Sequence, residues 1–241
     1  MFSYLITGAG RGLGLELTKQ LRQRPPSEVS AIFATIRGTP SETLQELVVE
    51  AQGRIVIVHL VVTEKEGIAA AVDQVKEKLD GRGLDVLINN AVITETSPDG
   101  AVSMGALRET LQVNVEAGHE VTVAFLALLR EGREKKVLNL SSSVGSIALA
   151  RLYAVAPHPA YKISKAALNN LTAQYALELE KDGFTFVVVS PGWLKTDMGG
   201  EYAQLDVSVG ASAVLDVIAR DGKELRFRDS TQSKSSSTYL T

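Results

Sequence analysis

The sequence predicts a single-domain α/β protein with a doubly wound parallel β-sheet and helices on both faces. Three observations predict this class: short apolar runs rich in β-branched residues, longer helical stretches that alternate with them, and a glycine-rich turn after the first run. The 241 residues fit one α/β unit. Hydrophobic residues make up 45% and charged residues 22%, so the composition excludes a mainly disordered chain.

Each predicted strand is a short run that is mostly apolar at successive positions, as expected where a strand is covered on both faces. The predicted strands are Phe2–Thr7, Ala31–Ile36, Arg54–Val62, Leu84–Asn89, Lys136–Leu140 and Phe184–Ser190. The stretches between them predict helices, and in the last one apolar residues recur at near-helical spacing. The predicted helices are Gly12–Arg24, Ser41–Gln52, Lys65–Asp80, Leu107–Arg130 and Pro159–Asp182. Strands alternating with helices indicate right-handed βαβ units.

Composition and charge exclude several classes of function. The net charge is −3, so there is no excess of basic residues for a nucleic-acid surface. Cysteine is absent, which excludes disulfides and cysteine metal sites, and the three histidines His59, His119 and His158 lack metal-ligand spacing. The apolar run Val121–Leu129 is far shorter than the ~20 residues of a membrane span. With no signal peptide visible at the N-terminus, a cytoplasmic protein without a membrane partner is expected.

The C-terminal end has a different composition. Eight of the twelve residues from Ser230 to Thr241 are Ser or Thr, a composition that buries too little apolar surface to order itself. The predicted domain organisation is therefore a folded domain over residues 1–229 and a disordered tail over residues 230–241.

The first predicted strand leads into the turn Thr7-Gly8-Ala9-Gly10-Arg11-Gly12-Leu13-Gly14. Glycines between a strand and a helix permit a tight turn and let the backbone approach a pyrophosphate at the helix N-terminus. The glycine spacing resembles the TGxxxGxG turn of short-chain dehydrogenases/reductases more than the common GxGxxG. Alone, such a turn is equally compatible with an ordinary loop.

Further segments occur in the order typical of that family and cover about four-fifths of the chain. They are Asn89-Asn90-Ala91, Asn114 between two valines, Asn139-Leu140-Ser141-Ser142-Ser143, the YxxxK pair Tyr161 and Lys165, and Pro191-Gly192-Trp193-Leu194-Lys195-Thr196-Asp197-Met198. The sequence therefore resembles the short-chain dehydrogenase/reductase family, and in particular its sniffer and C-factor branch of carbonyl reductases. The resemblance implies a Rossmann fold and an oxidoreductase acting on a small carbonyl or alcohol, as a possible homo-oligomer.

The resemblance also implies four catalytic residues: Asn114, Ser142, Tyr161 and Lys165. Tyr161 and Lys165 are four residues apart in a predicted helix, so they lie on one face. Lys165 is expected to lower the pKa of the Tyr161 phenol, and Ser142 to orient the substrate oxygen. Ser141 and Ser143 remain alternatives to Ser142, because the triple serine permits a register slip. Asn114 is expected to distort its helix and to hold a water molecule in a proton relay.

NADP(H) is the predicted cofactor. An acidic residue about 20 positions after the glycine-rich turn typically binds the ribose of NAD, whereas arginine accepts the extra phosphate of NADP. No Asp or Glu lies between Val29 and Ser41, and Arg37 closes the second strand. The predicted cofactor-binding residues are Gly8, Arg11, Gly12, Leu13, Gly14, Arg37, Asn90, Tyr161, Lys165, Leu194 and Thr196.

The sequence departs from the family pattern at several positions. Val61 replaces an Asp that helps to hold adenine in relatives, and Val92 replaces a Gly, which is costly if φ is positive there. Nineteen positions separate Ser142 from Tyr161, which is more than in many members of the family. The extra residues lie in Ala150–Pro159, include Tyr153, and are expected near the pocket. Only Glu224–Arg228 could form a closing strand. Two other hypotheses therefore stand beside the reductase: a nucleotide-binding module with little turnover, and an enzyme of dehydration or isomerisation.

Overall fold

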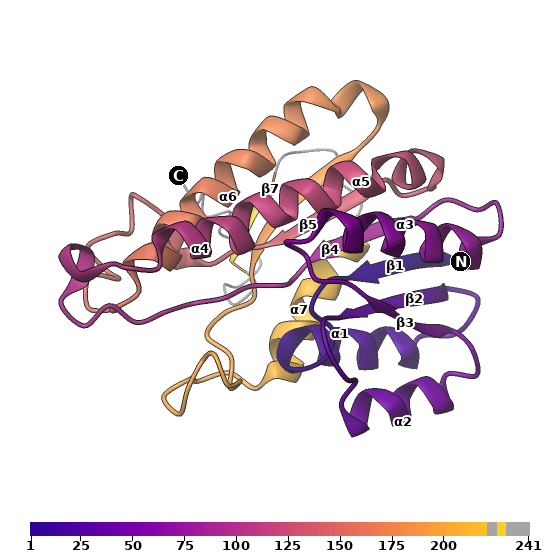
Figure 1. The fold of residues 1–241 in the computed structure, drawn as a ribbon, viewed down its shortest axis with the longest axis horizontal. Coiled ribbons are helices and arrows are strands. Elements are labelled where there is room, and N and C mark those ends of the chain that lie inside the picture. Colours follow the sequence, from indigo (N-terminus) through magenta and orange to yellow (C-terminus); the bar gives the residue numbers. More distant parts are fainter. Residues whose placement is uncertain (221–225, 230–241) are drawn as a thin grey trace.

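The computed structural model describes residues 1–220 and 226–229, and these residues confirm the predicted α/β class. They form one seven-stranded parallel sheet with the strand order β3-β2-β1-β4-β5-β6-β7 (Figure 1). The strands are β1 (Phe2–Ile6), β2 (Val29–Ile36), β3 (Ile55–His59), β4 (Val86–Asn89), β5 (Lys136–Leu140), β6 (Thr185–Ser190) and β7 (Arg226–Asp229). The order matches a Rossmann sheet, in which successive strands first extend to one side of β1 and then to the other.

Helices cover both faces of this sheet, as Figure 1 shows. On one face lie α1 (Gly12–Gln23), α2 (Glu42–Glu50) and α7 (Val207–Ala219). On the other lie α3 (Lys65–Leu79), α5 (Ala117–Glu131) and α6 (Pro159–Glu178), with the short α4 (Leu107–Leu111) ahead of α5. Of these described helices, none has the length and apolar character needed to cross a lipid bilayer.

Strand residues alternate between the two hydrophobic cores. In β1, Tyr4 and Ile6 pack in the core beneath α1, α2 and α7, while Leu5 packs in the core beneath α3 and α5. Leu5 and Ile6 are both completely buried. The side chains of a strand point alternately to opposite faces, so a strand covered on both sides reads as a continuous apolar run. This double burial is the reason that the strands were visible in the sequence.

The order of the strands places a crevice at the carboxyl ends of β1 and β4. From β1 the chain continues outward to β2 and β3, and it then returns to β4 on the opposite side. In open parallel sheets, ligands bind at such a reversal point, because the loops leaving the two strands diverge there. The glycine-rich turn leaves β1 and the Asn89-Asn90-Ala91 segment leaves β4, so both predicted motifs meet at this crevice.

Several element boundaries differ from the prediction. The helix expected over Leu107–Arg130 is divided into α4, a π-helical turn over Gln112–Glu116, and α5. Helix α7 was not predicted as an element. The closing strand β7 runs over Arg226–Asp229 and pairs in parallel with β6, whereas Glu224 and Leu225 of the predicted strand lie outside the described residues. The Ser/Thr-rich tail over residues 230–241 also lies outside them, so its disorder stays a prediction.

Val92 carries no backbone strain. The non-glycine residues with positive φ in the described chain are Gln52, Asp80 and Lys135, and Val92 is not among them. The position that is glycine in relatives therefore has a conformation that a β-branched residue adopts at no special cost. The departure Asn-Asn-Ala-Val does not distort this turn.

Candidate active site

The glycine-rich turn has positions at which only glycine fits. Gly8 and Gly12 have φ values of +68° and +54°, a region that L-residues rarely adopt. A Cβ atom at Gly14 would lie only 2.4 Å from the Gly8 carbonyl oxygen, so helix α1 packs directly on the turn. The Asn90 amide braces the turn by donating to the carbonyl oxygens of Thr7 (2.8 Å) and Gly8 (3.1 Å). Asn90 therefore holds the turn, and its own contact with a cofactor stays a prediction.

The turn presents the N-terminus of α1 toward the crevice. Arg11 is the N-cap residue, but its side chain makes no capping hydrogen bond, and the first turn contains no acidic residue. The first backbone N–H groups of a helix lack partners within the helix and carry a partial positive charge, which favours an anion. The glycine cradle and this uncapped helix end fit the pyrophosphate of a dinucleotide cofactor.

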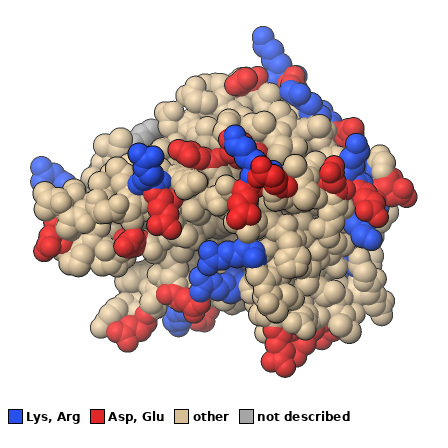
Figure 2. Space-filling model, viewed as in Figure 1, with Lys and Arg blue, Asp and Glu red and all other residues tan. Residues whose placement is uncertain are grey.

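The two predicted arginines differ in their surroundings. Arg37 follows β2 directly, is exposed, and forms no ion pair with any residue in the described part of the chain. Arg11 donates to Asp197 at 2.6 Å, and both side chains are more than 70% exposed. Figure 2 shows Lys and Arg side chains gathered beside a hollow near the middle of the face that it displays. Of these two arginines, Arg37 is the one without an ion pair among the described residues.

Leu194 and Thr196 come from the segment after β6. Leu194 is buried and packs against Gly210 of α7, and it forms an isolated parallel bridge with Leu205. The Thr196 methyl group faces the glycine-rich turn, 3.6 Å from where a Cβ of Gly12 would lie. The structure therefore brings Thr196 to the predicted cofactor cleft, while the Leu194 side chain packs mainly into the fold.

The structure distinguishes the three serines. Ser141 is buried and donates to the Asn169 side chain at 2.6 Å. Ser143 accepts a hydrogen bond from Tyr153 at 2.9 Å. Ser142 is the serine whose side chain lies near enough to Tyr161 to lower the pKa of its phenol, against the larger effect of burial. Of the registers that the sequence left open, this geometry favours Ser142 as the partner of the tyrosine.

Gly145 explains how the serine turn reaches helix α6. A short 3-10 turn over Ser143–Gly145 follows β5, with Ser142 as its N-cap. A Cβ atom at Gly145 would lie 2.7 Å from the Lys165 Cβ and 2.8 Å from the Lys165 carbonyl carbon. Only glycine lets the backbone come this close, so Gly145 allows the serine turn to rest on the helix that carries Tyr161 and Lys165.

Tyr161 and Lys165 lie on one face of α6, as predicted. The Lys165 nitrogen is 5.2 Å from the centre of the Tyr161 ring and donates to the Leu140 carbonyl oxygen at 2.7 Å. Burial raises the pKa of Tyr161 to about 12, and Ser142 acts in the opposite direction. Burial lowers the pKa of Lys165 to about 7. Burial is thus the dominant influence on the Tyr161 pKa in this structure, and the expected lowering of that pKa by Lys165 stays a prediction.

Asn114 lies within the π-helical turn, so the expected distortion of its helix is present. Its amide oxygen accepts from the Ile93 N–H (2.9 Å), and its amide nitrogen donates to the Ile93 carbonyl (2.9 Å) and to Ser164 (3.0 Å). These bonds join the segment after β4 to helix α6. The Asn114 side chain therefore fixes the position of the π-turn beside Lys165.

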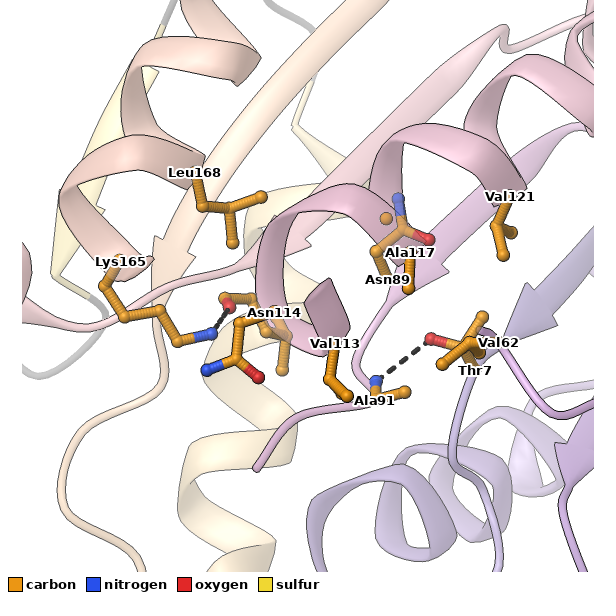
Figure 3. Close-up of a pocket in the computed structure, with 12 residues that line it drawn as sticks. Thr7, Val62, Asn89, Ala91, Val113, Asn114, Ala117, Val121, Lys165 and Leu168 are labelled. Carbon is orange, nitrogen blue, oxygen red and sulfur yellow. Dashed lines mark hydrogen bonds between the residues drawn. The ribbon is translucent and has the colours of Figure 1, made fainter. Parts of the chain in front are cut away.

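A small cavity lies between Lys165, Asn114 and the end of β4 (Figure 3). It has room for about one water molecule. Asn89 lines this cavity, and its buried amide oxygen has no hydrogen-bond partner in the described part of the structure. Figure 3 shows the Lys165 amine and the Asn114 amide close together on one side of the cavity, with Asn89 across from them. Sequence reasoning quoted Asn89 in a motif but gave it no role.

The buried Lys165 predicts a specific dependence of stability on pH. The pKa is about 7 in the fold, against an ordinary value of 10.5, so the unfolded chain binds more protons between these values. The free energy of unfolding should therefore rise with pH from about 7 to about 10.5, and the cost of Lys165 is fully present below pH 7. In Lys165→Met we expect a stability gain on the order of a few kcal/mol near pH 7 that shrinks toward pH 10.

The measurement is denaturant unfolding of both proteins at several pH values. Taking the difference between the two proteins cancels the titration of every other group. A difference that stays constant between pH 7 and pH 10 would show that the Lys165 pKa is not lowered in the fold.

The comparisons with known proteins agree with this geometry. The family model described as short chain dehydrogenase matches residues 3–206. The chain belongs to the short-chain dehydrogenase family. Among curated relatives, it is 38% identical over 204 residues to the short-chain dehydrogenase/reductase AacuF of Aspergillus aculeatus, covering 80% of this chain and 74% of the relative. It is 30% identical to the norsolorinic acid ketoreductase of Aspergillus parasiticus, covering 84% and 74%.

Solved structures of carbonyl reductases are also similar to this short-chain dehydrogenase. The NADPH-bound carbonyl reductase from chicken fatty liver has a TM-score of 0.84 and 32% identity, with 92% of each chain covered. The carbonyl reductase Sniffer of Drosophila melanogaster has a TM-score of 0.84 and 29% identity, with 95% of this chain and 97% of that one covered. These similarities confirm the resemblance to the sniffer-like branch and support oxidoreduction with a nicotinamide cofactor.

Proposed function

We propose that this short-chain dehydrogenase is an NADP(H)-dependent carbonyl reductase that acts on a ketone or aldehyde, or oxidises the matching alcohol. One observation carries the proposal: Ser142 lies close enough to Tyr161 to influence its pKa, with Lys165 one helical turn from Tyr161, at the same end of the sheet as the glycine-rich turn. A hydroxyl pair of this kind can hold a carbonyl oxygen from two sides. The nearby helix N-terminus supplies the place for a dinucleotide.

The chain's own residues account for the proton and the orientation of the substrate. A bound nicotinamide cofactor would supply the hydride that reaches the carbonyl carbon. Ser142 donates a hydrogen bond to the carbonyl oxygen and orients it. Tyr161, whose pKa of about 12 keeps it protonated at neutral pH, gives its proton to that oxygen as negative charge develops. The product is the alcohol, and Tyr161 is left as the phenolate.

Lys165 and Asn114 support this proton transfer. The Lys165 amine offers donors for the ribose hydroxyls of the cofactor, and its pKa of about 7 lets it gain or lose a proton near neutral pH. The cavity between Lys165 and Asn114 has room for the water molecule of a proton relay. Through this route Tyr161 regains its proton before the next turnover.

NADP(H) is favoured over NAD(H) by charge. Arg37 lies at the end of β2 without an ion-pair partner in the described chain, and the stretch from Val29 to Ser41 contains no carboxylate. The similar chicken carbonyl reductase is described as NADPH-bound, and the fungal relative as a ketoreductase. The proposed partner of the reaction is a small carbonyl compound or alcohol, and the proposal places the enzyme in the cytoplasm.

Cofactor consumption tests the proposal directly. The purified protein is incubated with NADPH and a panel of ketones and aldehydes, some of which also carry a hydroxyl group, and oxidation of NADPH is followed together with the products. We expect turnover with at least one aromatic or lipophilic carbonyl. NADPH binding without turnover across the panel favours the binding-module hypothesis, and conversion of a hydroxylated substrate without change in the cofactor favours dehydration or isomerisation.

A further inference from the structure

The loop between the serine turn and helix α6 contains a tyrosine that contacts both sides of the site. This loop spans residues 146–158, within the stretch that separates Ser142 from Tyr161. Tyr153 lies in its middle and is partly buried. Its hydroxyl and its carbonyl group both form hydrogen bonds, and each bond leads to a different part of the site. Tyr153 has no part in the chemistry described above.

The Tyr153 hydroxyl bonds to the serine side of the site. It donates to the Ser143 side chain at 2.9 Å. Ser143 follows Ser142 directly, and its backbone N–H donates to Ser190 at the end of β6 at 3.3 Å. Tyr153 and Ser190 therefore hold Ser143 from two directions, and a shift of Ser143 would carry Ser142 with it.

The Tyr153 carbonyl group bonds to the tyrosine side of the site. The Lys162 amine donates to it at 2.6 Å. Lys162 follows Tyr161 directly in the first turns of α6, and its backbone N–H donates to the His158 carbonyl at 3.0 Å. The same loop residue is thus bonded to the chain neighbour of Ser142 and to the chain neighbour of Tyr161.

The far end of the loop is attached as well. The Ser97 N–H donates to the Pro157 carbonyl at 2.8 Å, and the His158 ring lies 3.4 Å from the Thr94 hydroxyl and 3.1 Å from the Glu95 carbonyl. The loop is therefore fixed to the segment that follows β4, and Tyr153 is held between fixed points. A residue held in this way can set the separation of the two groups that it joins.

We propose that Tyr153 is a positioning residue, which keeps Ser142 and Tyr161 at the separation that the reaction needs by bonding to Ser143 and Lys162. This inference rests on the carbonyl reductase proposed above. Geometry at a reacting centre has steep effects on rate, because catalytic groups work only when aligned with the substrate atoms. Tyr153 touches neither substrate nor cofactor in this role, so its loss should lower the rate without removing the chemistry.

The first test is Tyr153→Phe, which keeps the ring and removes the hydroxyl. A neutral hydrogen bond contributes about 0.5–1.5 kcal/mol, so kcat should fall roughly threefold to tenfold. The dissociation constant of NADPH and the melting temperature should stay close to wild type. Tyr175→Phe is the matched control, since the Tyr175 hydroxyl also bonds to a side chain, His119 at 2.7 Å. Tyr175 is 14 residues beyond Tyr161 in α6, roughly 21 Å along the helix, and this control should leave kcat unchanged.

A double-mutant cycle shows whether the effect passes through Ser143. If it does, Ser143→Ala, Tyr153→Phe and the double variant should all lose kcat by a similar factor, because each removes the same bond. Losses that multiply in the double variant would show that Tyr153 acts by another route, and the proposal would be wrong. A normal kcat in Tyr153→Phe would also overturn it.

A measurement without turnover separates this inference from the proposed function. The ¹³Cζ chemical shift of Tyr161, assigned with Tyr161→Phe, reports the surroundings of its phenol, including the effect of Ser142. Tyr153→Phe should move this signal, and Tyr175→Phe should not. An unchanged signal overturns the positioning role even if no carbonyl substrate is found. A moved signal in a protein that reduces no carbonyl supports the positioning role and contradicts the reductase.

Discussion

Tyr161→Phe should abolish most carbonyl reduction while leaving NADPH binding nearly intact. The substitution removes one hydroxyl from a ring that otherwise keeps its place on α6, four residues before Lys165. With a pKa of about 12, Tyr161 carries its proton at neutral pH and can donate it as the carbonyl oxygen gains charge. The remaining hydroxyl of Ser142 can orient the oxygen but is a far weaker acid. Loss of a general acid typically costs a factor of about 10² to 10⁴ in rate.

The measurement is kcat with the best ketone of the panel, together with the dissociation constant of NADPH. Tyr175→Phe serves as a control on the same helix and should keep full turnover. Turnover at the wild-type level in Tyr161→Phe would remove Tyr161 from the mechanism. A large loss of NADPH affinity instead would assign the tyrosine to cofactor binding and not to proton transfer.

The raised pKa of Tyr161 also has a consequence for the direction of the reaction. Alcohol oxidation requires the phenolate, which is scarce at neutral pH when burial raises the pKa to about 12. Reduction requires the neutral phenol, which is the abundant form. For the proposed enzyme we therefore expect carbonyl reduction to be faster than alcohol oxidation near pH 7.

Much of the fold could be predicted because its strands are buried on both faces. In β6 the residues from Phe186 to Val189 are all apolar, since alternate residues pack against helices on opposite sides of the sheet. The glycine-rich turn was also readable, because positive φ at Gly8 and Gly12 restricts those positions to glycine. Burial on both faces and positive φ each restrict the residue type at single positions, so both can be recognised in the sequence.

The features that the sequence missed depend on contacts between distant residues. The sequence could not decide which of the three serines lies beside Tyr161. In the structure Ser141 is bonded to Asn169, and Ser142 is the serine that affects the pKa of Tyr161. The ion pair of Arg11 joins residues 186 positions apart. The direction of the Tyr161 pKa followed from burial by the whole fold, which no local pattern reports.

The π-helical turn at Asn114 shows the limit of reading periodicity. Apolar residues at helical spacing predicted one helix over Leu107–Arg130, and the chain is in fact helical through most of this range. Asn114 in the π-turn accepts a hydrogen bond from Ile93, in the segment after β4, and donates one to Ser164 of α6. π-turns of this kind often lie at functional sites. Here the resemblance to a family, and not the periodicity, placed the distortion.

Arg37→Ala should weaken NADPH binding roughly tenfold to a hundredfold and change NADH binding little. The two cofactors differ in the 2′-phosphate, which carries close to two negative charges at neutral pH. Arginine meets a phosphate with paired, charge-assisted hydrogen bonds and does not lose its proton. A hydrogen bond to a charged group contributes ~1.5–3 kcal/mol, which corresponds to the expected range of affinity loss.

Two further arginines make this test specific. Arg11 is already paired with Asp197, so a phosphate must compete with a carboxylate for it, and Arg11→Ala should weaken NADPH binding less than Arg37→Ala. Arg82 lies between α3 and β4, at the opposite end of the parallel sheet from the crevice, and Arg82→Ala removes the same charge without touching the cleft. It should leave both cofactors unaffected. The four proteins are compared by the dissociation constants of NADPH and NADH at one fixed salt concentration, because screening alters charge contributions. Equal weakening of NADPH and NADH binding in Arg37→Ala, or a wild-type preference for NADH, would contradict the assignment of Arg37 to the 2′-phosphate. NADH lacks this phosphate, so Arg37 should affect NADPH binding selectively.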